Sequence, residues 1–84
     1  MVNSMKQVLG FQQIIVSPEL LEEYSQKCKR KDKRVTVRCF LLQLGYNPQF
    51  CNVGIDGEMV YAFESIYLEL DQRITIIPHV AGGN

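Results

Sequence analysis

Cysteine and histidine are scarce in this chain, and their pattern argues against two common kinds of small domain. The 84 residues include three cysteines, Cys28, Cys39 and Cys51, and one histidine, His79. An odd number of cysteines without a Cys-x-x-Cys pair does not fit a disulfide framework, and one histidine does not complete a zinc site. We therefore expect reduced, buried structural thiols and no bound metal, with Cys39 on a helix and Cys28 and Cys51 on strands.

A net charge and a long apolar run are also absent. Nine Lys and Arg residues balance nine Asp and Glu residues, so no global charge field points to nucleic acid or to a membrane. No apolar run approaches the roughly 20 residues that span a bilayer. The segment Met1–Lys6 lacks the apolar core of a signal peptide. These absences predict a soluble, cytoplasmic protein with neither a membrane nor a nucleic acid as its partner.

The sequence shows no motif of catalysis. It contains no phosphate-binding loop, no catalytic triad and no pair of carboxylates at a catalytic spacing. Asp56 and Glu58 flank a glycine, and a hairpin turn explains both. A nucleophilic cysteine needs a nearby base, and His79 is the one histidine, which we interpret as a surface residue next to the tail. We therefore predict that the chain is not an enzyme.

The apolar content is high enough to build a core. Hydrophobic residues make up 46% of the chain and aromatic residues 10%, which argues against global disorder. We find no internal repeat, low-complexity tract or linker. Residues 1–84 are therefore expected to form one domain, with residues 79–84 as an extended C-terminal tail.

Two helices are predicted after a first strand over Phe11–Val16. Ser17, Pro18 and Glu19 combine a capping serine, a proline at the first helical position and an acid in the first turn. The second and clearer helix has its apolar face at Val37, Phe40, Leu41 and Leu44, which follow the i, i+3, i+4, i+7 pattern. Its expected caps are Thr36 and Gly45.

The segment between the two predicted helices is strongly basic, and it admits two interpretations. Clustered Lys and Arg are what phosphate binding requires, so the segment could contact nucleic acid. Alternatively it is a solvated edge strand and turn, which its lysines protect from unwanted pairing. We favour the edge strand because no aromatic residue interleaves with the charges. The cations are Lys27, Lys29, Arg30, Lys31, Lys33, Arg34 and Arg38, around the one acid Asp32.

Strands are predicted over the rest of the chain. Asp56-Gly57 is a two-residue hairpin turn between strands at 53–55 and 58–60. Residues 61–67 are less regular and are expected to cross over the sheet. Residues 73–77 are apolar on both faces, which indicates a central strand, and the chain must leave the sheet at about Pro78 because proline has no backbone donor.

Two glycines, Gly82 and Gly83, follow this strand. Glycine has no Cβ and loses more backbone entropy on ordering than any other residue, so we expect a mobile tail that can thread a narrow channel. Asn84 follows the two glycines. The tail is the candidate functional site.

Three stretches of the chain, residues 36–46, 53–60 and 70–83, resemble in this order the ThiS/MoaD sulfur-carrier family of ubiquitin-like β-grasp proteins. One minor departure is Asp71-Gln72-Arg73, which replaces a turn that usually contains glycine. The N-terminal third resembles a MoaD-like variant in layout, with a strand, a short helix and a second strand before the main helix. The resemblance implies an α+β β-grasp fold, with a mixed sheet of four or five strands packed on one main helix and a flexible C-terminal tail.

The resemblance also implies a carrier rather than a catalyst. In such families an adenylating enzyme of the ubiquitin-activating type uses ATP and magnesium to activate the terminal glycine carboxylate, and a sulfur donor then converts it to a thiocarboxylate. By this analogy Gly83 would carry the reactive carbonyl and Gly82 would let the tail pass a tight channel. A peptidase would first have to remove Asn84. Apolar residues of the sheet would dock on the activating enzyme.

Two alternatives remain open at this stage. The run from Ile74 to Gly82 also resembles the end of a β-grasp domain in the tail-assembly proteins of lambda-like bacteriophages. In that setting Asn84 would stay in place, and the domain would be a structural module of a virion without sulfur chemistry. A third interpretation is a ubiquitin-like modifier, processed by a peptidase, that passes its activated glycine to an amine.

Overall fold

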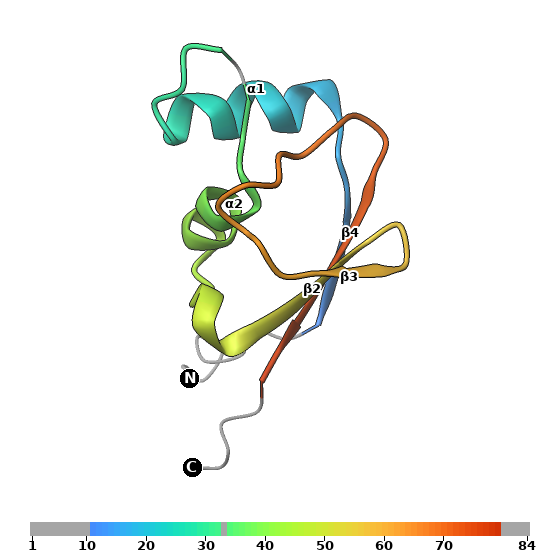
Figure 1. Ribbon diagram of the computed structural model, residues 1–84. Coiled ribbons are helices and arrows are strands. Elements are labelled where there is room, and N and C mark those ends of the chain that lie inside the picture. Colours follow the sequence, from blue (N-terminus) through green and yellow to red (C-terminus); the bar gives the residue numbers. More distant parts are fainter. Residues whose placement is uncertain (1–10, 33, 80–84) are drawn as a thin grey trace, which may run out of the picture.

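Four strands and two α-helices make up the described part of the chain, residues 11–32 and 34–79 of a computed structural model (Figure 1). A short 3-10 helix, η2, precedes the second strand. The elements in chain order are β1 (Gln12–Ile15), α1 (Pro18–Lys27), α2 (Val37–Leu44), η2 (Pro48–Phe50), β2 (Cys51–Ile55), β3 (Glu58–Val60) and β4 (Arg73–Pro78). The fold is α+β, in agreement with the ubiquitin-like β-grasp that the resemblance implies.

The sheet has the strand order β1-β4-β2-β3, and β4 is a central strand as predicted. All three pairings are antiparallel, so the prediction of a mixed sheet was wrong. The direction of β1 follows from its connection to the turn before β4. The Val16 N–H donates to the Gln72 carbonyl at 2.9 Å, and the Asp71 N–H donates to the Val16 carbonyl at 2.8 Å. The end of β1 is therefore held where β4 begins, and the two strands run in opposite directions.

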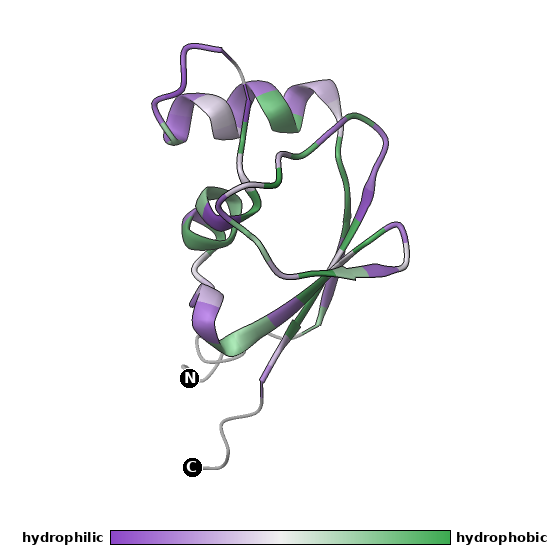
Figure 2. Ribbon diagram, viewed as in Figure 1, coloured by the Kyte–Doolittle hydropathy of each residue, from purple (hydrophilic) through white to green (hydrophobic). Residues whose placement is uncertain are grey.

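The core lies between one face of the sheet and the two helices (Figure 2). Ile74 and Ile76 of β4 are fully buried and pair in register with Ile55 and Val53 of β2. The fully buried residues of α2 are Val37, Phe40 and Leu41, as its apolar pattern predicted. From α1, Leu20, Leu21 and Tyr24 pack against this cluster. Burial of these side chains is the main stabilising contribution to the fold.

Local capping explains where both helices begin and where α2 ends. Ser17 Oγ accepts a hydrogen bond from the Leu20 N–H at 3.0 Å, and Thr36 Oγ1 accepts one from the Cys39 N–H at 3.1 Å. Gly45 ends α2 with a φ of 97°, a left-handed conformation that a residue without Cβ adopts at little cost. These three caps are confirmed.

The predicted hairpin between β2 and β3 is also confirmed. Asp56 has a φ of 52° and Gly57 a φ of 89°. Positive φ at both central residues is typical of a type I′ turn, whose twist matches that of the strands. The Arg73 N–H donates to Asp56 Oδ1 at 2.9 Å, so this turn is also tied to the start of β4.

The basic segment between the helices is not an edge strand, so that prediction was wrong. Lys27 belongs to α1, where it forms an i,i+4 ion pair with Glu23 at 3.2 Å. Cys28 caps the end of the helix and is not in a strand. Within the described residues, the segment contributes one isolated bridge, between Thr36 and Tyr67. The second strand expected before the main helix is therefore absent from this part of the chain.

Cys28 and Cys39 form a disulfide, so the prediction that all three thiols are reduced was wrong. Their Cα atoms are 6.3 Å apart, within the usual range for a disulfide. The pairing arises because the last turn of α1 packs beside the first turn of α2, a proximity that the cysteine count could not reveal. Cys51 is buried in β2 and free, as expected. Disulfides persist in oxidising compartments, so the cysteines no longer support a cytoplasmic location.

No helix in the described residues is long and apolar enough to cross a membrane.

Substitution of Leu41 tests the assignment of the core. Leu41 is fully buried, whereas the next residue, Leu42, is 48% exposed. We expect Leu41→Ala to lower the free energy of unfolding by about 2–5 kcal/mol, because it leaves a cavity beneath α2. The matched control Leu42→Ala should change it by less than about 0.5 kcal/mol. Urea denaturation followed by circular dichroism measures both values, and equal losses would contradict this core.

Removal of the disulfide tests its contribution to stability. The two cysteines are 11 residues apart, and closing a loop of this size stabilises a protein by about 3 kcal/mol in the chain-entropy description. We expect the double variant Cys28→Ser, Cys39→Ser to lose about this much stability under oxidising conditions. Reduction of the parent chain should give a similar loss. A parent chain that melts at the same temperature with and without reductant would show that the bond does not form.

Candidate functional site

The predicted site residues Gly82, Gly83 and Asn84 lie outside the described residues, so the prediction that residues 79–84 form an extended tail is not tested beyond His79. The structure does show how the chain approaches this segment. In Figure 1, β4 runs away from α1 and ends at Pro78, as expected. Pro78 pairs in register with Cys51, the first residue of β2. The chain therefore reaches the tail at the end of the sheet farthest from α1.

The end of β4 is held by the short helix η2. Asn47 Oδ1 accepts a hydrogen bond from the Gln49 N–H at 2.9 Å and so caps η2. The Phe50 carbonyl, at the end of η2, accepts a hydrogen bond from the His79 N–H at 2.7 Å. Because proline lacks a backbone donor, this bond from His79 is what continues the attachment of the chain past Pro78. The His79 side chain is exposed, which agrees with its interpretation as a surface residue.

One face of the sheet faces away from the core and carries exposed apolar side chains. Successive residues of a strand point to opposite faces, so the neighbours of Ile74 and Ile76 point outward. We name this surface the outer sheet face. Its large apolar members are exposed by 41–53%. It comprises Gln13 and Ile15 of β1, Arg73, Thr75 and Ile77 of β4, Asn52 and Gly54 of β2 and Met59 of β3.

Gly54 makes the middle of this face shallow. A Cβ at Gly54 would lie 3.9 Å from the Met59 sulfur and 4.0 Å from the Thr75 Cβ, which are ordinary contacts. Met59 and Thr75 therefore flank a position without a side chain, on the strand next to β4. The outer sheet face thus combines exposed apolar side chains with a central position that lacks a side chain, which lets a protein partner approach the backbone closely.

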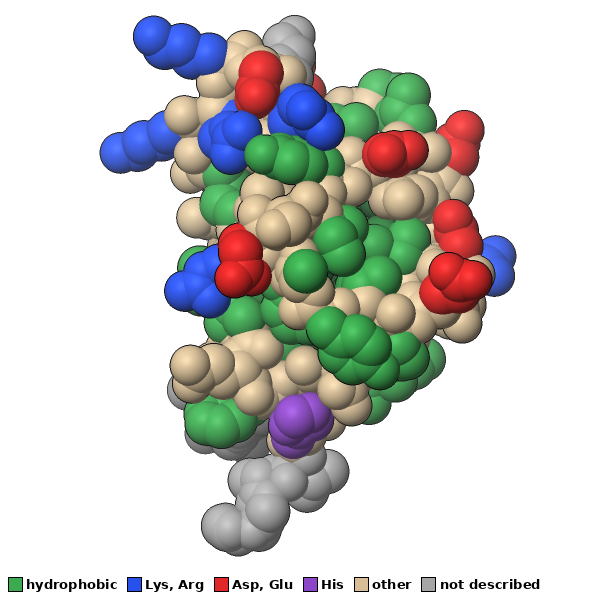
Figure 3. Space-filling view, viewed as in Figure 1, with side chains coloured by type: hydrophobic (Ala, Val, Ile, Leu, Met, Phe, Trp, Pro, Cys, Tyr) green, Lys and Arg blue, Asp and Glu red, His purple; other side chains and the backbone are tan. Residues whose placement is uncertain are grey.

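Exposed aromatic residues surround the end of the sheet where β4 finishes. Phe11 directly precedes β1, Phe50 bonds to His79 through its carbonyl, and Tyr61 directly follows β3. The register places all three near this end, because β1 begins opposite the last residues of β4 and β3 ends opposite the start of β2. Their exposed fractions are 62%, 58% and 76%, respectively. Figure 3 shows apolar side chains next to His79 on the face in view.

The other candidate residues have structural rather than catalytic roles. Asp56 holds the start of β4, and Glu58 is exposed at the first position of β3. Burial raises the pKa of the Cys51 thiol above its usual value, so this residue stays protonated and unreactive at neutral pH. No group of three potential metal ligands exists in the part of the chain that the structure describes. The outer sheet face and the aromatic residues near the end of β4 are surfaces to which a protein partner can bind.

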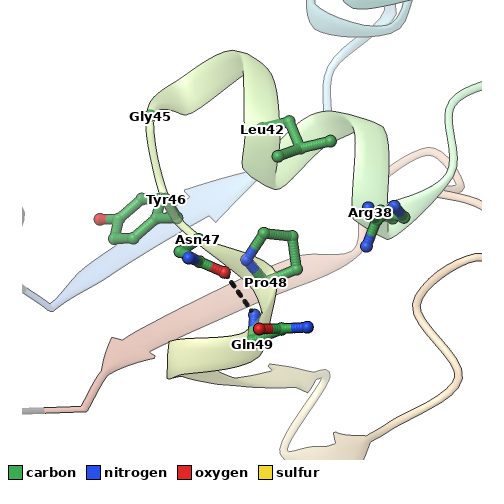
Figure 4. Close-up of a pocket in the computed structure, with 7 residues that line it drawn as sticks. All are labelled: Arg38, Leu42, Gly45, Tyr46, Asn47, Pro48 and Gln49. Atoms are coloured by element: carbon green, nitrogen blue, oxygen red, sulfur yellow. Dashed lines mark hydrogen bonds between the residues drawn. The ribbon is translucent and has the colours of Figure 1, made fainter.

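An open depression lies beside α2, on the side of that helix opposite its buried residues (Figure 4). Its volume is about 490 Å³. Arg38 and Gln49 contribute polar groups, and Leu42 and Pro48 contribute apolar surface. The sequence did not predict it, because it forms where the loop after Gly45 folds back along the helix.

The structure also reveals an aromatic residue beneath the basic segment that sequence reasoning missed. Arg34 Cζ lies 3.9 Å from the centre of the Tyr67 ring, and Arg30 Cζ lies 5.6 Å from it. Tyr67 is far along the chain and is brought there by its bridge with Thr36. No local pattern near the arginines could have indicated this contact. An aromatic ring therefore does lie among these cations, although the sequence of the basic segment contains none.

Comparison with known proteins gives one match. A family model described as the ThiS family matches residues 18–83, from the first residue of α1 to the second glycine of the predicted tail. No curated protein and no solved structure matches the chain.

Proposed function

The chain belongs to the ThiS family, and from this premise we propose that it is a sulfur carrier whose reactive carbonyl is that of Gly83. Proteins of this family are ubiquitin-like sulfur carriers rather than catalysts, and they act with activating enzymes. The observation that carries the proposal is the family match itself, which extends through Gly82 and Gly83. The end of the central strand β4 at Pro78, shortly before these glycines in the sequence, supports it.

Activation at Gly83 requires a free carboxylate at this residue. The Gly83 carbonyl is bonded to the nitrogen of Asn84, so a peptidase must first hydrolyse that bond. An adenylating enzyme then uses ATP and magnesium to form an acyl-adenylate, and a sulfur donor displaces AMP to leave a thiocarboxylate. The chain contributes two residues without Cβ, which can enter a channel too narrow for a side chain.

The outer sheet face is the surface that we assign to docking of the activating enzyme. It carries exposed apolar side chains at Ile15, Met59 and Ile77, and it continues into the ring of aromatic residues around the end of β4. A partner bound to this face would also lie next to the point where the tail begins. Docking there would bring the glycines to the partner's active site without any rearrangement of the core.

The intact mass of the chain recovered from its native host tests this function. We expect a species that has lost Asn84 and exchanged one carboxylate oxygen for sulfur. Gly83→Ala should prevent the exchange and leave the melting temperature unchanged, because the described core consists of residues between Ile14 and Ile76.

Three other outcomes would contradict the carrier function. An unprocessed chain recovered within a larger particle would indicate a phage tail-assembly module, and the protein would then be located in a virion rather than in the cytoplasm. A covalent conjugate with another protein would indicate a ubiquitin-like modifier. A large loss of stability in Gly83→Ala would show that the tail is packed structure.

Charge substitutions on the outer sheet face test the docking surface. We expect Ile77→Glu and Met59→Glu to lower the fraction of the chain that carries sulfur at least about tenfold, because each puts a charge into an apolar contact. The matched control Leu42→Glu places the same charge on the exposed face of α2 and should leave the fraction unchanged. Intact mass measures the fraction, and circular dichroism verifies the fold. Equal losses in all three variants would exclude this face as the docking surface.

A further inference from the structure

The zero net charge of the chain conceals a strong separation of charge. Residues 27–38 contain seven of the nine Lys and Arg residues but one of the nine Asp and Glu residues. In Figure 3 most of the Lys and Arg side chains in view gather at the end of the molecule opposite His79, whereas others lie at its left and right edges. A local excess of positive charge can attract a polyanion even when the whole chain is neutral.

The structure holds this segment in a defined shape. We name residues 28–39 the basic loop, because the disulfide between Cys28 and Cys39 closes it. The backbone is fixed at several points in the described part of the loop. The Arg30 N–H donates to the Ser25 carbonyl at 2.8 Å, and the Val35 carbonyl accepts from the Leu68 N–H at 2.8 Å. Backbone that is already fixed in this way loses less entropy when it binds a ligand.

The acid within the basic loop is engaged internally. Asp32 Oδ1 accepts a hydrogen bond from the Arg34 N–H at 3.1 Å, and Asp32 Oδ2 pairs with Arg30 at 3.2 Å. The Arg34 N–H and the Arg30 guanidinium lower the pKa of the Asp32 carboxyl below its usual value. Asp32 therefore stabilises the conformation of the loop. The side chains of Lys29, Lys31 and Arg34 are exposed to solvent.

Arg34 and Tyr67 form a stacked pair on this surface. The guanidinium carbon lies 3.9 Å from the centre of the ring, which is the distance of direct contact between planar groups. Tyr67 is half-buried and fixes the position of Arg34, whose side chain remains exposed. A guanidinium plane held in this way can stack on a nucleic-acid base and donate hydrogen bonds to a phosphate at its edge.

The described residues of the basic loop carry no exposed large apolar side chain, since Val35 and Val37 are buried. A protein-binding surface normally has apolar or aromatic anchors at its centre and few lysines there. Stable binding to a membrane surface likewise relies on apolar side chains that enter the lipid. Interfaces with nucleic acid are more polar and much more positive. These features together favour nucleic acid over an acidic protein or a membrane surface as the partner of the basic loop.

We propose that the basic loop binds single-stranded nucleic acid. Lys29 and Lys31 contact phosphates, and the Arg34–Tyr67 pair stacks on one base. Lys29, Lys31 and Arg34 lie between α1 and α2, in neither a helix nor a strand that could enter a duplex groove, which is why a single strand fits them better. The site lies at the end of the molecule opposite His79, so it goes beyond the carrier function and can act at the same time.

Fluorescence anisotropy with a labelled single-stranded RNA of mixed sequence, titrated at several salt concentrations, tests the phosphate contacts. Each lost contact should reduce the slope of log K against log salt by about 0.7. We therefore expect this reduction for Lys31→Gln. The matched control Arg73→Gln removes the same charge on β4 and should behave as the parent chain. Equal effects of these two substitutions would overturn the assignment of the site to the loop.

A second pair of variants separates stacking from charge. Arg34→Lys keeps the positive charge but removes the planar group, so we expect RNA affinity to fall about five- to tenfold while the salt slope is unchanged. Tyr67→Phe retains the ring beneath Arg34 and should bind RNA as the parent chain does. Loss of affinity in Tyr67→Phe equal to that in Arg34→Lys would contradict the stacked pair.

Competition experiments distinguish the polyanions. Poly-glutamate and vesicles containing phosphatidylserine should displace the labelled RNA poorly, and unlabelled RNA should displace it fully. Displacement by either competitor as strong as that by RNA would overturn the choice of nucleic acid, as would the absence of binding at low salt. Gly83→Ala should bind RNA normally, so failure of this proposal and failure of the carrier function give different results.

Discussion

The pairing of β4 on both of its sides is the constraint on which the rest of the structure depends. β1 and β2 run antiparallel to β4 on its two sides, and the inward residues Ile74 and Ile76 form the centre of the core. The same strand presents Thr75 and Ile77 on the outer sheet face. It also ends at Pro78, shortly before the glycines in the sequence. One strand thus determines the core, the docking surface and the origin of the tail.

The two ends of the described structure differ in chemistry, and a separate function is proposed for each. Around the end of β4 the exposed residues are apolar and aromatic, which suits a protein partner. At the other end the basic loop is closed by a disulfide and carries Arg34 stacked on Tyr67. Because the two surfaces share no residue, a partner at one end leaves the other accessible. Under the two proposals, activation at one end leaves the other end free to bind a polyanion.

Much of the fold was predictable because many of its determinants are local. The caps at Ser17, Thr36 and Gly45 and the turn at Asp56-Gly57 depend on residues a few positions apart. The prediction failed between the helices, where lysines suggested an edge strand and an odd cysteine count suggested free thiols. Both errors concern contacts between α1 and α2, which no local pattern encodes.

The sequence by itself determined the helices, the hairpin, the identity of the central strand and the two glycines of the candidate tail, because each depends on neighbouring residues or on composition. Only the tertiary structure decided the direction of β1, the partner of Cys28 and the position of Tyr67 beneath Arg34. It also decided which apolar side chains remain on the outer sheet face. These features result from the packing of segments distant in the chain, which burial of the common core selects.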